Sequence, residues 1–348
     1  MRDGPAPAPR EQGWLRIVLA LAAFLLVPHA PGLQALLPVV ETLLLLLPVL
    51  SVCFLLGWWH GGSFWVAMVW LALTVWLFVL PAPSGVSDAY YDLARAWGLI
   101  VGAAFGVVCL VGRQRTFLDR ALSAVGLAIL LGVMLAAIER TDVRRAREVF
   151  AEEFATRNAA AAAVMEESSR MIGDAIGERL PGTASFAVRF AAMKAAGQPA
   201  LSRLAVPLYP ALLALEALAA CALAWGLHFR LSRARIGPPL APFRNFGFTD
   251  QLIWAVVAGI TLMVLPTLAP LATPGENLVV FFGALYALRG YGIFAWFASR
   301  RLVTVSVTVV LVTLLITLEP FVATIPAAVG LGLSDTWFDW RRRASGKS

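Results

Sequence analysis

Apolar runs long enough to cross a lipid bilayer follow one another along most of this chain. A helix needs about 20 mainly apolar residues to cross about 30 Å of hydrocarbon. Such runs occur at 14–27, 34–56, 64–80, 96–112, 121–138, 205–228, 251–272, 277–298, 302–318 and 320–338. With 60% hydrophobic and 14% charged residues, the chain cannot form a water-soluble domain without exposing apolar surface on every side. The sequence therefore predicts an all-α polytopic transmembrane bundle of about eight to ten membrane segments.

The last two apolar runs are separated at Glu319-Pro320. Because proline removes a backbone hydrogen-bond donor and favours a turn, we expect residues 302–338 to form a tight hairpin. A single long helix, tilted or broken, is the alternative, and it would lower the number of membrane segments by one.

Basic residues predict the orientation of the chain. If the N-terminus lies in the cytoplasm, nearly all Lys and Arg of the short loops lie on that side, and Arg95 is the exception. We therefore expect both termini in the cytoplasm. The same bias accounts for the net charge of +7, so nucleic acid is not expected as a partner. The lipid bilayer is the expected environment.

The positions of the apolar runs divide the chain into five parts. A polar arm at 1–13 precedes about five membrane helices at 14–139 and an extracytoplasmic segment at 140–204. Four or five more membrane helices at 205–340 lead to a basic tail at 341–348.

In the extracytoplasmic segment, apolar residues recur at spacings of seven and four, which is typical of a helix with one buried face. These residues are Val143, Phe150, Phe154, Ala161, Met165, Ile172 and Ile176. We expect a long amphipathic helix on the membrane surface, or a helical hairpin that folds back at Asn158 or Gly173 and ends at Pro181-Gly182.

Four ionisable residues stand out within or between the apolar runs, because a charge at the centre of a membrane segment costs about 2.5 to 3.5 kcal/mol on insertion scales. They are Glu41, Glu216, Arg289 and, at the expected hairpin turn, Glu319. Arg289 has Gly290 and Gly292 beside it and Tyr286 and Tyr291 close by, which suggests room for an anionic group. The alternative is that Arg289 and Glu216 neutralise one another and lock the bundle.

Packing and interface positions can be assigned from spacing. Gly98, Gly102 and Gly106 lie on one helix face and predict close approach of another backbone, more readily within this chain than from a partner. Phe243 and Arg244 are expected at the cytoplasmic headgroup level. Asp335 and Asp339 are four residues apart on one predicted helix face, within reach of Arg342, Arg343 or a basic loop.

Known catalytic and metal-binding motifs are missing from the sequence. Cys53, Cys109 and Cys221 lie far apart within apolar runs and are interpreted as buried packing residues. The three histidines, His29, His60 and His228, are isolated, and HExxH, GxSxG and Walker motifs are absent. We therefore predict no metal, no cofactor and no enzymatic activity.

The C-terminal third resembles the YybS-like family of bacterial multi-pass membrane proteins, a domain of unknown function. The resemblance rests on Pro239-Leu-Ala-Pro-Phe-Arg-Asn-Phe, Asp250 with Trp254, Asn277-Leu, Leu285-Tyr-Ala-Leu-Arg-Gly290 and Gly330-Leu-Gly-Leu-Ser-Asp-Thr-Trp-Phe-Asp-Trp-Arg. It covers about the last 110 residues and implies a multi-pass protein of the bacterial cytoplasmic membrane, without implying an activity.

Together these features predict a membrane protein that binds or transports a small solute. The expected pocket lies between the segments that carry Glu216, Arg289, Tyr286 and Tyr291, with the extracytoplasmic helix as a cover. The alternative is a non-enzymatic scaffold or assembly factor of a cell-envelope complex, with a membrane protein as its partner. The heptad pattern and the aromatic, basic loops suggest this alternative.

Overall fold

The computed structural model describes residues 14–30, 33–34, 36–111, 116–138, 143–177, 184–300 and 318–344. In these ranges all regular structure is helical, which confirms the predicted all-α class. The first part of the chain forms seven helices: α1 (Trp14–Leu26), α2 (Leu43–Trp59), α3 (Phe64–Val79), α4 (Asp88–Val111), α5 (Phe117–Ile138), α6 (Val143–Gly177) and α7 (Ala184–Leu231). The later part forms α8 (Ile253–Val264), α9 (Ala272–Arg300), α11 (Leu318–Phe338) and α12 (Trp340–Ala344). Short 3-10 turns lie at η1 (Val27–His29), η2 (Phe243–Asn245), η3 (Asp250–Leu252) and η4 (Pro266–Leu271).

Within the described ranges, four helical stretches are long and apolar enough to cross a membrane: Asp88–Val111, Phe117–Ile138, Ala205–Leu231 and Pro266–Phe297. Shorter apolar helices lie at Trp14–His29, Leu43–Trp59, Phe64–Val79 and Asp250–Val264. Large apolar side chains on the outer faces are exposed, including Trp65 and Trp76 of α3 and Trp254 of α8. Lipid is the solvent that suits such a surface. The chain is therefore a membrane protein.

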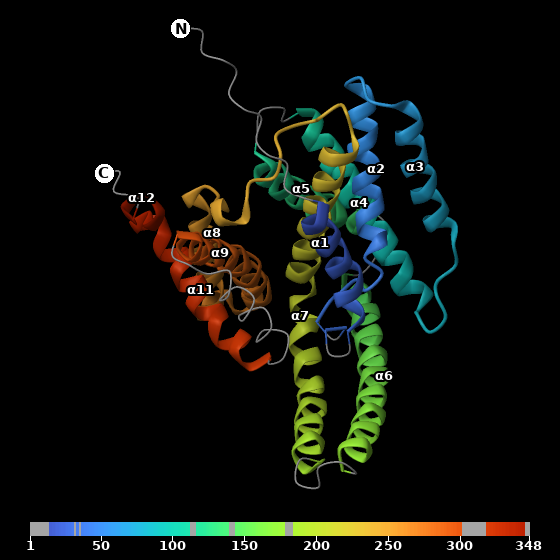
Figure 1. Ribbon diagram of the computed structural model, residues 1–348, viewed down its shortest axis with the longest axis vertical. Coiled ribbons are helices and arrows are strands. Elements are labelled where there is room, and N and C mark those ends of the chain that lie inside the picture. Colours follow the sequence, from blue (N-terminus) through green and yellow to red (C-terminus); the bar gives the residue numbers. More distant parts are fainter. Residues whose placement is uncertain are drawn as a thin grey trace.

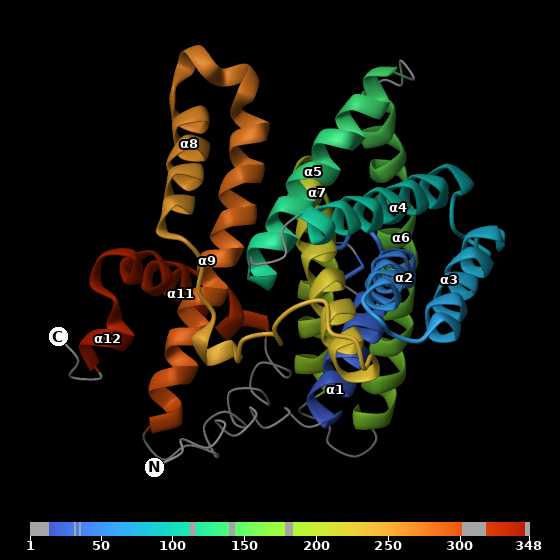
Figure 2. The ribbon, with the colours of Figure 1, turned by 90° about the horizontal axis from the view of Figure 1, so that it is seen from above.

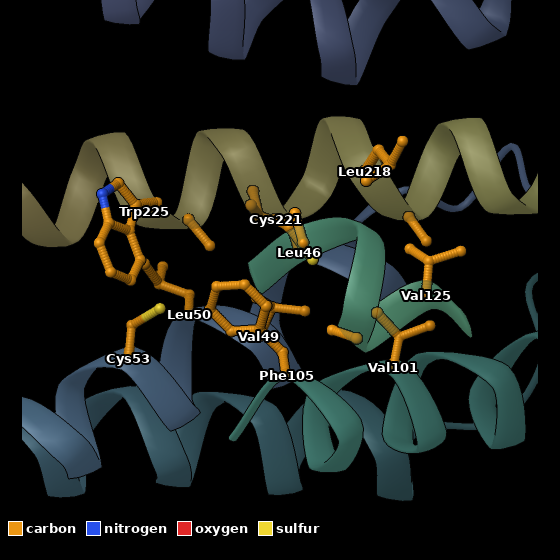
Figure 3. Close-up of a cluster of buried hydrophobic side chains, with 14 of the residues drawn as sticks. Leu46, Val49, Leu50, Cys53, Val101, Phe105, Val125, Leu218, Cys221 and Trp225 are labelled. Carbon is orange, nitrogen blue, oxygen red and sulfur yellow. The ribbon is translucent and has the colours of Figure 1, made fainter. Parts of the chain in front are cut away.

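The central core lies where α2, α4 and α7 meet (Figure 3). Val49 and Leu50 of α2, Phe105 of α4 and Trp225 of α7 point into the same space, and all four are almost fully buried. Trp225 contacts Phe105 edge-on, with ring centroids 6.1 Å apart. Such a dry, aromatic-rich centre fixes the positions of the three helices relative to one another.

Glycines allow α4 to approach α2 closely. A methyl group at Gly98 would overlap the carbonyl oxygen of Leu44, and one at Gly102 would lie 3.0 Å from Cβ of Pro48. At Gly106 it would lie 2.9 Å from Cγ1 of Val52. The three glycines thus form one contact face, and its neighbour is α2 of the same chain.

Helices α6 and α7 include most of the segment that was predicted to be extracytoplasmic, and the chain does not fold back at either predicted position. Helix α6 passes through Asn158 and Gly173 without a break and ends at Gly177. The second arm begins at Ala184 and continues as α7 into the membrane segment, without a boundary near residue 204. Figure 1 shows the far ends of α6 and α7 side by side, extending beyond the other helices. Asn158 and Gly173 do not interrupt the helix because neither removes a backbone donor, as proline does. The predicted stop at Pro181-Gly182 lies outside the described residues.

On the predicted stripe, Phe150, Phe154 and Ala161 are buried as expected. The side chains of Val143, Met165, Ile172 and Ile176 lie outside the described residues.

Helices α8, α9 and α11 pack beside the α1–α7 group. The antiparallel α8 and α9 are seen nearly end-on in Figure 1 and lengthwise in Figure 2, so they cross α7 steeply. Asn277 of α9 joins the two groups. Its side chain accepts a hydrogen bond from the backbone N–H of Ala211 at 2.9 Å and donates one to the carbonyl oxygen of Pro207 at 2.9 Å. These two backbone groups are one helical turn apart, so Asn277 binds a single turn of α7.

Two predicted boundaries in this part are wrong. The expected segment 251–272 divides at Leu265, where α8 gives way to the proline-containing η4. The expected turn at Glu319-Pro320 lies instead in the first turn of α11, which begins at Leu318. Proline is tolerated there because the first helical N–H groups have no intrahelical partner. Residues 301–317, which include the other half of the predicted hairpin, lie outside the described residues.

Candidate functional site

A cavity of about 760 Å³ lies between α1, the connection that follows α1, and the membrane part of α7. Helix α1 packs beside α7 (Figure 2). The walls are mainly apolar and include Ile17, Phe24, Leu215 and Leu223. The polar residues in the wall are Arg16, Thr42, Glu216 and Arg230. This volume lies within the range of about 300 to 1,000 Å³ that is usual for small-molecule sites.

Glu216 is the polar group of α7 at one end of this cavity. It lies near the centre of the Ala205–Leu231 span and is only 7% exposed. Its Oε2 accepts a hydrogen bond from the backbone N–H of Val39 at 3.1 Å. Its Oε1 is buried and has no hydrogen-bond partner among the described residues. A buried carboxyl oxygen without a partner is costly, so this atom is the strongest indication of a ligand in the cavity.

Arg16 and Arg230 lie at the opposite end of the cavity. Arg16 is in the first turn of α1 and is exposed, whereas Arg230 is in the last turn of α7 and donates to the carbonyl oxygen of Gly226 at 3.3 Å. At 1.5 Å per residue, Arg230 is about 21 Å from Glu216 along the helix axis. The cavity thus has a cationic end and an acidic interior.

A charged cluster adjoins Glu216 where α6 enters the bundle. Arg157 of α6 donates from Nε to Glu153 at 2.9 Å, and its Nη2 lies 3.8 Å from Glu41. The hydroxyl of Tyr90 donates to Glu41 at 2.8 Å, and the Arg157 guanidinium lies 4.4 Å from the centre of the Tyr90 ring. Arg157 and Glu41 are also electrostatic neighbours of Glu216. Ionic contacts therefore connect the α6–α7 hairpin to the wall of the cavity.

Glu153 and Arg157 are functional candidates that the sequence analysis missed. Both are buried, with exposed fractions of 4% and 9%, although neither belongs to the predicted apolar stripe. Their spacing from Phe150, Phe154 and Ala161 puts all five residues on one helix face. Charges on the buried side of an amphipathic stripe could therefore have been recognised from the sequence.

Arg289 does not share a site with Glu216. Its Nε bonds to Asp335 of α11 at 2.9 Å, and its Nη1 bonds to Asp250 of η3 at 2.8 Å. The expected pairing of Arg289 with Glu216 is therefore wrong, and so is the predicted pocket between their segments. The two side chains have different neighbours: Arg289 bonds to α11 and η3, whereas Glu216 accepts a hydrogen bond from Val39 in the connection before α2.

Protein fills the space expected beside Arg289. A methyl group at Gly290 would overlap the backbone of Ala328 in α11, and one at Gly292 would lie 2.7 Å from the carbonyl oxygen of Phe243. Tyr286 is buried and stacks edge-on against Phe248, with ring centroids 5.0 Å apart. The hydroxyl of Tyr291 lies 3.1 Å from that of Thr324. These glycines permit close helix packing and leave no room for an anion.

The predicted interface residues have different surroundings. Asp335 is buried and accepts the backbone N–H of Trp340 at 2.9 Å, in addition to its bond with Arg289. Asp339 lies between α11 and α12, with φ of 40°, so it does not continue the helix face of Asp335 as predicted. A left-handed backbone at this position ends α11. Phe243 and Arg244 are exposed, as an interfacial position requires.

The cysteines and His228 are buried packing residues. Cys53, Cys109 and Cys221 are buried free thiols. His228 is buried against Phe54, with ring centroids 5.1 Å apart. Among the described residues there is no group of three or more His, Cys, Asp or Glu side chains that could hold a metal ion.

Searches against protein-family models, curated proteins and solved structures gave no significant match to this chain. The function must therefore be argued from the cavity and the charged cluster.

Proposed function

We propose that this membrane protein binds and moves a small apolar or amphiphilic solute in the cavity between α1 and α7. The observation that carries the proposal is that Glu216 lines a cavity of about 760 Å³ and that its buried Oε1 has no hydrogen-bond partner among the described residues. An apolar pocket with a few polar groups is the usual form of a small-molecule site. An ionisable residue inside a membrane segment is a functional candidate by default.

The cavity also favours solute binding over the scaffold alternative. A scaffold needs a tightly packed interior and a large docking surface outside the lipid zone. Here the α2, α4 and α7 core is tightly packed, whereas the α1 side of α7 lines open space. Entry from the lipid side suits a solute that partitions into membranes, because much of α1 is exposed.

We also propose that the end of the cavity that carries Arg16 and Arg230 faces the cytoplasm of a bacterial cell. Arg16 and Arg230 line one cavity, so they lie on the same side of the membrane, and the excess of Lys and Arg favours the cytoplasmic side. Reporter fusions at each terminus test this orientation. An extracytoplasmic C-terminus would contradict it.

Filling the cavity tests the solute-binding proposal. Ala219 lines the cavity one helical turn from Glu216, so we expect Ala219→Phe to occupy the space that a solute needs. Ala137 of α5 is exposed and does not line the cavity, so Ala137→Phe is the matched control. Purified full-length proteins in lipid nanodiscs are screened for thermal stabilisation by a panel of cationic, neutral and anionic amphiphiles.

We expect at least one compound to stabilise the unmodified protein and the Ala137→Phe variant but not the Ala219→Phe variant. Bound ligand raises thermal stability only if it binds the folded state, so the comparison reports binding at the cavity. If every active compound stabilises all three proteins equally, this cavity is not a solute site. The same conclusion follows if no compound stabilises any of the three proteins.

A further inference from the structure

We infer that Glu216 exchanges a proton for an organic cation, so that the cavity takes amphiphilic cations and releases a proton when one binds. This inference rests on the proposed solute site and assigns it a ligand class and a coupling ion. It is carried by the contacts of Glu216 and by the charges that surround it.

The two oxygens of the Glu216 carboxyl group have different environments. Oε2 accepts a hydrogen bond from the backbone N–H of Val39 at 3.1 Å, whereas Oε1 has no hydrogen-bond partner among the described residues. A single hydrogen bond does not replace the hydration of a carboxylate that is 7% exposed. In the empty cavity the carboxyl group is therefore stable with a proton on Oε1. The ionised form needs a cation at that position.

The described residues supply too little positive charge at this end of the cavity. Glu41, from the connection before α2, and Arg157, from α6, act on Glu216. Arg157 is already bound to Glu153 at 2.9 Å and lies 3.8 Å from Glu41, and its Nη1 donates to the carbonyl oxygen of Leu37 at 3.4 Å. Three carboxyl groups thus face one guanidinium. When all three are ionised, this end of the site carries net negative charge.

The other charges near the cavity lie at its far end. Arg16 on α1 and Arg230 on α7 line that end, about 21 Å along α7 from Glu216 at 1.5 Å per residue. Cations there do not neutralise Glu216, but they repel a ligand's positive charge and so favour its placement at the Glu216 end. Between the two ends, Ile17, Ala20 and Phe24 of α1 supply an apolar wall for the body of the ligand. The Phe24 ring can also stabilise a nearby cation.

The exchange step balances in atoms and charge. The O–H bond of the Glu216 carboxyl group breaks, its proton passes to water, and the bonding electrons stay on the carboxylate oxygen. The carboxylate then pairs with the ligand cation, and no oxidation or reduction takes place. A single proton leaves for each monovalent cation that enters, so the charge of the occupied site equals that of the empty site.

Tetraphenylphosphonium is a suitable probe, because tetraphenylborate has nearly the same shape and the opposite charge. Binding to the full-length protein in nanodiscs is measured by calorimetry in buffers of different ionisation enthalpy, which reports the protons released for each ligand. We expect about one proton to be released for each bound cation, and the apparent affinity to rise as the pH increases, by at most about tenfold for each pH unit. Tetraphenylborate is expected not to compete.

Glu216→Gln keeps an acceptor for the Val39 N–H and nearly the same volume. We expect it to weaken tetraphenylphosphonium binding at least tenfold and to abolish proton release. Glu276→Gln on α9 is the matched control, because Glu276 does not line the cavity, and it should behave like the unmodified protein.

Each result separates this inference from the proposed function. If Ala219→Phe blocks tetraphenylphosphonium binding but no proton is released, or if Glu216→Gln binds with unchanged affinity, the exchange is refuted while the solute site stands. Preferential binding of tetraphenylborate at the cavity would likewise refute the ligand class. If Ala219→Phe changes the binding of no amphiphile, the solute site itself is refuted.

Discussion

Arg289→Met should destabilise the protein mainly because it breaks the buried ion pair with Asp335. Loss of the more exposed ion pair with Asp250 should contribute less. The Arg289 side chain is 9% exposed and bonds to Asp335, which is 5% exposed, and to Asp250, which is 58% exposed. Removing one partner of a buried pair costs about 3 to 5 kcal/mol, because the other charge stays buried. An exposed pair contributes about 0.2 to 1 kcal/mol. The loss at Asp335 therefore dominates.

The surroundings of Asp335 favour the lower end of this range. After the substitution, Asp335 still accepts the N–H of Trp340 at 2.9 Å, and Arg341 remains 3.9 Å away. Burial lowers the pKa of Arg341, but this guanidinium keeps its charge and offsets part of the loss. We expect Arg289→Met to cost about 3 kcal/mol. Asp250→Asn should cost less than about 1 kcal/mol.

A double-mutant cycle measures this asymmetry. Reversible unfolding in mixed micelles, followed by tryptophan fluorescence, gives the free energy of unfolding of Arg289→Met, Asp335→Asn, the double variant and the unmodified protein. Asn at 335 keeps an acceptor for Trp340 and removes the charge, so we expect a coupling energy of about 2 kcal/mol between positions 289 and 335. A coupling below about 0.5 kcal/mol, or equal effects of Asp250→Asn and Asp335→Asn, would refute the assignment of Arg289 as a buried link between α9 and α11.

Two further substitutions test the packing described above. Asn277→Ala should lower the free energy of unfolding by about 1 to 3 kcal/mol, because two hydrogen bonds between α9 and α7 are lost; an unchanged unfolding curve would mean that the α7 backbone closes its own ladder. Gly98→Ala should destabilise the protein by about 1 to 3 kcal/mol, because the added methyl group overlaps the α2 backbone. Gly126 of α5 has open space around it, so the control substitution Gly126→Ala should be neutral or slightly stabilising when thermal unfolding of both variants is compared. Similar losses of stability in the Gly98→Ala and Gly126→Ala variants would contradict the close α2–α4 contact.

Local sequence pattern predicted the features that depend on near neighbours in the chain. The apolar runs predicted α3 and α5 nearly to their ends, and the spacing of Phe150, Phe154 and Ala161 predicted the buried face of α6. These features follow from helix period and hydrocarbon thickness, which act on consecutive residues. The sequence pattern also marked Glu41, Glu216 and Arg289, because an ionisable residue in an apolar run is unusual regardless of the fold.

Pairing between distant residues could not be predicted in the same way. Arg289 meets Asp250 and Asp335, Glu216 meets the backbone of Val39, and Arg157 joins Glu41. Each guanidinium could pair with several carboxylates. The Coulomb energy of each pairing depends on burial and distance, and these are set by the folded structure.

The chain alone thus determined that lipid solvates this protein, that its structure is helical, and which few charges need a partner. Tertiary structure decided which partners they have and where space remains. Arg289 finds two carboxylates and a filled gap, whereas Glu216 keeps an unpartnered oxygen beside a cavity. The reason is physical: hydrophobicity and helix period are properties of each segment, whereas a cavity or an ion pair exists only between segments, and its position depends on how all of their side chains pack together.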